Sequence, residues 1–141
     1  MEEIRFNFPF QKVNKDKRIV TGIATAENID QSGDIVDFQG SLTAFKSWVG
    51  NIREMHGREA VGKAVSYNPT TVEYQGKRYP AIEVNAYISK GAPNTWEKVL
   101  DGTLRGFSIG GHIVEKGSMS IDGMDHRVIK SYVLGELSLV D

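Results

Sequence analysis

LRGFSIGGHIVE, residues 104–115, and RVIKSYVLGELSLV, residues 127–140, are the most informative segments for the fold of this chain. Both are rich in β-branched and other apolar residues, which is typical of strands. Between them lies Asp122-Gly123, and an Asp-Gly pair flanked by strands is a strong signal for a tight hairpin turn. The sequence therefore predicts two antiparallel neighbouring strands joined by a two-residue turn.

Further strands are predicted upstream of this hairpin, in residues 18–26, 61–67, 72–74 and 79–88. Side chains alternate between the two faces of a strand, so residues two apart share a face. One face of residues 79–88 is expected to carry Ile82, Val84, Ala86 and Ile88. One face of residues 18–26 is expected to carry Ile19, Thr21, Ile23 and Thr25.

Two short helices are expected between the strands. Ser41 suits the N-cap of the first, and Gly50 would end it. Its apolar stripe would be Leu42, Phe45, Trp48 and Val49. The second covers Pro93 to Leu100, because proline suits an early helical position, and Gly102 would end it. Many short strands with two helices predict a mainly β domain of the α+β class, a small β-barrel or sandwich with the helices packed outside.

Composition limits the function classes. A length of 141 residues fits a single domain covering 1–141. There is no cysteine, which excludes disulfides and a thiol nucleophile and is compatible with a reducing cytoplasm. A net charge of −1 gives no overall electrostatic case for nucleic acid or an anionic membrane. No apolar run reaches the length of a membrane span, so we expect a soluble intracellular domain.

Ser108 lies in Gly106-Phe107-Ser108-Ile109-Gly110, which spells the G-x-S-x-G pattern of the hydrolase nucleophile elbow. That motif requires a strand, a sharp turn and a helix around the serine. Here a β-branched segment follows instead, so the elbow interpretation fails on context. What remains is a serine on a strand with a glycine two positions away on either side, where a substrate backbone could approach closely.

A serine nucleophile needs a base within hydrogen-bond reach, and the chain has three histidines. His112 is four positions after Ser108, about 13 Å along a strand, which is too far. His126 adjoins the expected turn, where a solvent-facing residue is the simpler interpretation. His56 follows a separate segment and is not excluded by distance in sequence, although composition alone favours an ordinary surface or capping residue.

Glu136 interrupts an apolar strand, and a carboxylate there is costly unless it is paired. An imidazole N–H could pair with it; the competing interpretation is a glutamate at a barrel end that reaches water or an arginine. With a tight turn and no slip, Ile109 would face Glu136, and the carboxylate would lie on the side opposite Ser108. A β-bulge at Gly110-Gly111 or Gly117 would reverse this, so the sequence leaves the question open.

Metal sites are not indicated. Residues 30–37 form an acidic, turn-rich stretch that lacks the ligand pattern of a calcium loop, which favours a structural turn before the first helix. The three histidines have no local spacing typical of zinc ligands. We therefore expect neither a metal nor a cofactor.

In their order along the chain, several motifs resemble the prohead, or capsid-maturation, serine proteases of tailed phages. The matching segments are Ile19–Ala24, Asn28-x-Asp30-x-x-Gly33-Asp34-Ile35-Val36, the helix with Phe45 and Trp48, Met55-His56, Val61-Gly62, Leu104-x-Gly106-Phe107-Ser108-Ile109-Gly110-Gly111 and Glu136-Leu137-Ser138-Leu139-Val140. The resemblance covers about Arg18 to Asp141, nearly the whole chain.

This resemblance implies a compact antiparallel β-barrel with outer helices, similar to the herpesvirus assemblins, and a single protease domain over 1–141. It implies Ser108 as nucleophile, His56 as base and Glu136 as the acidic third member. The substrates would be phage scaffold, capsid protein and the protease itself, inside the immature capsid in the host bacterial cytoplasm. It allows a homo-oligomer, and a truncated or self-processed core.

Two other functions stay open. A catalytically inactive barrel could serve as a scaffold or capsid-assembly module. An esterase-type hydrolase could use the same serine, although the failed elbow context disfavours it. The distance between His56 Nε2 and Ser108 Oγ discriminates the first, since a working pair lies about 2.6–3.2 Å apart. Side chains on opposite faces would favour the inactive module.

Overall fold

The computed structural model describes residues 2–141, with side chains from Phe8 onward. Eleven elements follow the chain in the order β1 (Glu2–Pro9), β2 (Lys12–Asn14), β3 (Ile19–Ala26), β4 (Ile35–Val36), α1 (Phe38–Lys46), β5 (Asn51–Glu54), β6 (Ala60–Tyr74), β7 (Lys77–Ile88), α2 (Pro93–Leu100), β8 (Gly106–Ile121) and β9 (Met124–Val140). The described chain is thus mainly β with two helices, as the sequence predicts.

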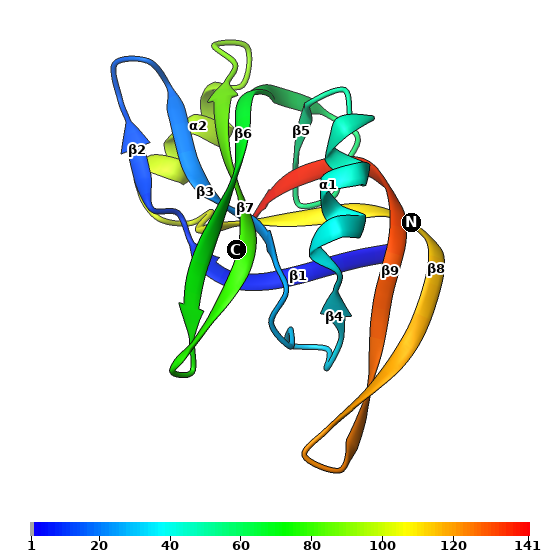
Figure 1. Ribbon diagram of the computed structural model, residues 1–141. Coiled ribbons are helices and arrows are strands. Elements are labelled where there is room, and N and C mark those ends of the chain that lie inside the picture. Colours follow the sequence, from blue (N-terminus) through cyan, green and yellow to red (C-terminus); the bar gives the residue numbers. More distant parts are fainter. Residues whose placement is uncertain (1) are drawn as a thin grey trace.

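The strands form one sheet in the order β1-β8-β9-β5-β6-β7-β3-β2, with β4 added beside β9. The sheet curls into a half-barrel, and α1 lies against β9 (Figure 1). An all-antiparallel barrel was expected, and this is wrong in one respect. Both β4 and β5 pair with β9 in parallel, while the other pairs are antiparallel. Parallel pairing is possible here because α1 returns the chain to the same sheet after β4.

The two ends of the sheet approach each other at the segment between β1 and β2. Phe10 N donates to Arg105 O just before β8, and Gln11 N donates to Thr21 O on β3. The Phe10 ring meets Phe107 edge to face, with centroids 5.0 Å apart. This contact closes one side of the core, to which nearly every strand contributes a buried side chain.

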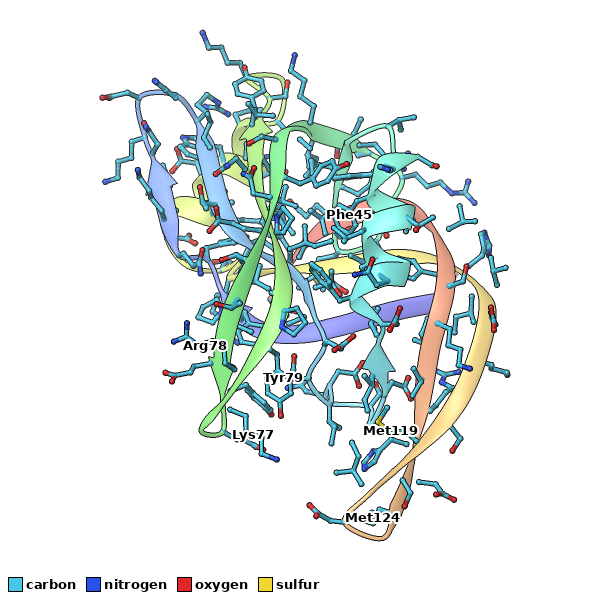
Figure 2. All side chains as sticks on the ribbon, in the orientation of Figure 1. Phe45, Lys77, Arg78, Tyr79, Met119 and Met124 are labelled. Atoms are coloured by element: carbon cyan, nitrogen blue, oxygen red, sulfur yellow. The ribbon has the colours of Figure 1, made fainter. Side chains whose placement is uncertain are left out.

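The predicted hairpin of β8 and β9 is confirmed. Ile121 pairs with Met124, and the intervening Asp122 and Gly123 both have positive φ, as a type I′ hairpin turn requires. A second long hairpin, β6–β7, projects toward the same side of the molecule (Figure 1). Figure 2 labels Lys77 and Met124 near the two tips, with Tyr79 and Met119 on the facing sides.

Between these two hairpins lies a hollow of about 610 Å³, lined in part by Tyr79, Met119 and Asp122. None of its lining residues is Ser108, His56 or Glu136. The hollow is therefore separate from the site described below.

Local predictions succeed for some elements and fail for others. The inward face of β7 is confirmed, because Ile82, Val84, Ala86 and Ile88 have no exposed surface. On β3 the prediction is confirmed for Ile19, Thr21 and Ile23, which pair with alternate residues of β7 and so share one face. It is wrong for Thr25, which pairs with Ile82 on the other face. A register shift between Ile23 and Thr25 breaks the alternation on which the prediction depended.

Helix α2 has the predicted bounds, although Leu100 on its expected apolar stripe is exposed. Helix α1 begins earlier than predicted, with Asp37 as its N-cap accepting from Gly40 N. Ser41 is buried inside the helix, where its hydroxyl accepts a hydrogen bond from Tyr132. Trp48 and Val49 lie beyond the helix end, and Val49 is exposed. Neither helix described in residues 2–141 has the length and hydropathy needed to cross a bilayer.

Candidate active site

Ser108, His56 and Glu136 come from three different elements and meet at one point. Ser108 lies on β8, Glu136 on β9, and His56 in the loop between β5 and β6. His56 Nε2 is 3.0 Å from Ser108 Oγ, and His56 Nδ1 is 2.5 Å from Glu136 Oε1. The imidazole therefore bridges the hydroxyl and the carboxylate, one ring nitrogen to each.

The carboxylate fixes which nitrogen of the ring carries the proton. An ionised carboxylate can only accept hydrogen bonds, so His56 Nδ1 must be the donor to Glu136. In a neutral imidazole the other nitrogen then presents a lone pair, and Ser108 Oγ–H is the donor to it. This is the arrangement in which an imidazole can take a serine proton.

A β-bulge puts Glu136 on the same side of the sheet as Ser108. Gly110 pairs with Glu136, while the next residue, Gly111, pairs with Leu134, so Gly135 is the extra residue on β9. Beyond the bulge Ser108 pairs with Ser138. Facing residues share a side, and Glu136 shares it too because it is two positions from Ser138. The register shift that the sequence leaves undecided is therefore present, and it lies between Gly110 and Gly111.

Asn51, the first residue of β5, holds the bulge in place. Its Nδ2 donates to Gly135 O over 3.0 Å, and its Oδ1 accepts from Trp48 Nε1 over 2.7 Å. The carbonyl of the extra residue thus has a hydrogen-bond partner on a neighbouring strand. The indole that was expected in a helical stripe instead orients this amide.

His56 lies in a tight turn with an uncommon backbone conformation. Gly57 N donates to Glu54 O, and the two central residues, Met55 and His56, have φ of 51° and 57°. A bulky residue with positive φ costs of order 1–3 kcal/mol and persists only where the surroundings enforce it. Such strain is typical of functional sites.

Four hydrogen bonds enforce this turn. Met55 N donates to Leu139 O, and His56 N donates to Ser138 Oγ over 3.0 Å, which ties the turn to β9. From β5, Arg53 Nη1 donates to the carbonyls of Gly57 and Arg58 over 3.3 and 2.8 Å. The imidazole position is therefore set by the backbone and by neighbouring side chains together.

The site is almost closed to solvent. Ser108 and Ser138 have no exposed surface, Glu136 is 4% exposed, and the His56 side chain is 10% exposed. Strand β1 pairs with the outer edge of β8 here, with Arg5 opposite Ser108. Low exposure strengthens the interaction between the imidazole and the carboxylate, and it also limits access to the serine.

Sequence reasoning missed Ser138, Asn51 and Arg53 as parts of this site. Ser138 had a detectable signal, since a residue two positions after Glu136 on a strand must point to the same side. Asn51 and Arg53 had none, because their roles depend on the pairing of β5 with β9.

The other two histidines lie apart from these three side chains. His112 is exposed on β8. His126 was expected to face solvent, but its Nδ1 lies 2.9 Å from Gly33 O, so it is half-buried against the loop between β3 and β4.

Residues 30–34 of the acidic stretch form a structural turn, as predicted, and Ile35 and Val36 continue into strand β4. Asp30 Oδ1 accepts from the backbone N–H groups of Ser32 and Asp34, and Asp34 is held by the Arg127 guanidinium.

Comparison with known proteins gives no relative. No protein-family model, no curated protein and no solved structure matches this chain. The functional argument therefore depends on the geometry above.

Proposed function

We propose that this chain is a serine endopeptidase in which Ser108 is the nucleophile, His56 the general base and acid, and Glu136 the residue that orients and charge-stabilises the imidazole. The observation that carries the proposal is the hydrogen-bonded series Ser108 Oγ, His56 Nε2, His56 Nδ1 and Glu136 Oε1. Three residues distant in sequence form this series by means of a bulge and a strained turn.

The proposed reaction follows the acyl-enzyme route. His56 Nε2 accepts the Ser108 proton as Ser108 Oγ attacks the scissile carbonyl carbon. The imidazolium then gives that proton to the leaving amine, which breaks the peptide bond and leaves an ester on Ser108. Water, activated by His56, hydrolyses the ester and restores the hydroxyl. Glu136 accepts from Nδ1–H throughout and balances the transient positive charge on the ring.

The substrate proposal depends on the resemblance to prohead proteases. By that resemblance the half-barrel is of the herpesvirus-protease type, and the substrates are phage scaffold, capsid protein and the chain itself within an immature capsid. The motif residues Met55-His56, Gly106 to Gly111 and Glu136 to Val140 support it, since all three segments contribute to one site.

One observation favours the alternative of an inactive assembly module. Ser108 has no exposed surface, and β1 runs beside it along the edge of β8. A peptide can reach Ser108 Oγ only if a neighbouring segment moves. The short distances from His56 to Ser108 and to Glu136 favour the protease, whereas the burial of Ser108 favours the inactive module.

A fluorophosphonate probe separates the two, because it reacts covalently only with an activated serine. We expect the probe to label the wild-type protein and the S118A variant, whose lost serine is exposed on the same strand, but not S108A. Absence of labelling in the wild type, or equal labelling of S108A, would contradict the proposal. Turnover of peptides but not of small esters would distinguish a protease from an esterase.

A further inference from the structure

The hydroxyl of Ser138 lies at the centre of the site and is bonded on two sides. Its Oγ–H donates to Glu136 Oε2 over 2.6 Å, and its oxygen accepts from His56 N–H over 3.0 Å. Ser138 also pairs with Ser108 across β8 and β9, and with Arg53 across β5 and β9. One fully buried hydroxyl thus contacts both the acid and the main chain of the base.

We propose that Ser138 is a positioning residue for the reaction proposed above. It is inferred to hold the Glu136 carboxylate and the His56 backbone in the one relative arrangement that lets the imidazole span from Glu136 to Ser108. This inference rests on the proposed function, since it names a further residue on which the same site depends.

The first argument concerns the carboxylate. Glu136 uses Oε1 for His56 and Oε2 for Ser138, so both oxygens have a partner. A buried carboxylate without such partners is costly, and a hydrogen bond donated to it stabilises its charged form. By holding Oε2, Ser138 keeps the other carboxylate oxygen, Oε1, directed at His56 Nδ1. The negative charge is needed there when the ring becomes imidazolium.

The second argument concerns the base. His56 has a φ of 57°, a conformation that its own sequence does not favour. Ser138 Oγ accepts from the His56 N–H and so fixes the Cα from which the ring extends. Because the same oxygen holds Glu136, any movement of the turn relative to the carboxylate breaks a hydrogen bond at Ser138. A site held to within a few tenths of an ångström needs such a shared support.

The test compares S138A with S41A in the full chain. Ser41 is a matched control because it is also a buried serine with a hydrogen-bonded hydroxyl, but its partner is Tyr132 and it lies on α1. We expect S138A to lower the second-order rate of fluorophosphonate labelling by about 10- to 100-fold, whereas S41A stays within about threefold. Both variants should melt at lower temperature than the wild type, since each loses a buried hydrogen bond.

A spectroscopic readout separates positioning from general destabilisation. The proton on His56 Nδ1 should give a downfield NMR resonance, because Nδ1 and its acceptor, Glu136 Oε1, are only 2.5 Å apart. In S138A this resonance should move upfield or broaden through exchange, and in S41A it should stay in place. An unchanged resonance together with unchanged labelling in S138A would overturn the inference.

A measurement on the wild type keeps the inference testable if S138A does not fold. The Ser138 hydroxyl proton should exchange slowly with solvent and show a cross-peak to the His56 amide proton, because both belong to the same hydrogen-bonded unit. A rapidly exchanging Ser138 hydroxyl would contradict it. The outcomes are distinct from failure of the proposed function, which would appear as an unlabelled wild-type protein.

Discussion

At the scale of single residues, the imidazole of His56 is defined by what surrounds it rather than by its own position in the sequence. It has one partner on each ring nitrogen and a backbone conformation held by Ser138 and Arg53. For such a histidine the acidic partner decides both the tautomer and the stability of the charged ring.

The E136Q variant tests this partner. Glutamine has nearly the same shape but no negative charge, so it cannot balance the imidazolium, and its amide group can donate where the carboxylate could only accept. We expect the labelling rate with a fluorophosphonate to fall by about 10²- to 10⁴-fold while circular dichroism shows a folded protein. A fall of less than about threefold in a folded variant would remove Glu136 from the proposed site.

At the scale of elements, the bulge between β8 and β9 decides whether a site exists. Without the extra residue, Ile109 would face Glu136 and the carboxylate would point away from Ser108. With it, Ser138, Glu136 and Ser108 share one side of the hairpin. A shift of a single residue therefore separates an ordinary hairpin from one that assembles the three side chains.

The G111A variant tests how closely the strands approach at this bulge. A Cβ at Gly111 would lie far inside van der Waals contact with the backbone oxygen of Val133, so the strands would have to separate. We expect a loss of about 1–3 kcal/mol in the free energy of unfolding, measured with urea, and a slower labelling rate. G117A is the matched control, since the atom its Cβ meets most closely belongs to the flexible Lys130 side chain. Equal stability of the two variants would contradict this account.

At the scale of the whole molecule, the site depends on how the curled sheet and its helices hold β5 beside β9. Glu54, the last residue of β5, accepts from Thr95 Oγ1 and from Lys98 Nζ, both on α2. The helix thereby anchors the strand immediately before the turn that carries His56. Although burial raises the pKa of Glu54, the hydrogen bonds from Lys98 and Thr95 lower it below its ordinary value.

The lowered pKa of Glu54 predicts that its contribution to the free energy of unfolding is lost in acid. A lowered pKa in the folded state means that the interaction stabilises the protein above the ordinary glutamate pKa and is lost as pH falls through the folded value. We expect E54Q to be less stable than wild type by under about 1 kcal/mol at pH 7, because the pair is partly exposed. That difference should shrink below about pH 4.5.

Urea unfolding at pH 7, 5 and 3.5 measures this difference. The E97Q variant is the control, since Glu97 is an exposed residue of α2, the helix that contacts Glu54. A difference between wild type and E54Q that is constant over this range would show that the charge of Glu54 is not responsible.

The local features of this protein can be predicted from its sequence. The Asp122-Gly123 turn, the alternation along β7 and the proline-started helix α2 depend on neighbours within a few residues, so composition and period predict them. The sequence also supplied the three site residues, with the help of a family resemblance, and their catalytic roles stay a prediction.

The features that join distant segments become visible only in the folded protein. Such features are the register shift at Gly110-Gly111, the parallel pairing of β5 with β9, the left-handed turn at His56 and the two hydrogen bonds of the Ser138 hydroxyl. Each depends on hydrogen bonds between residues that are far apart in the chain or on different strands. A one-dimensional pattern shows that a glycine permits a bulge, but the balance of packing across the whole sheet determines where the extra residue goes.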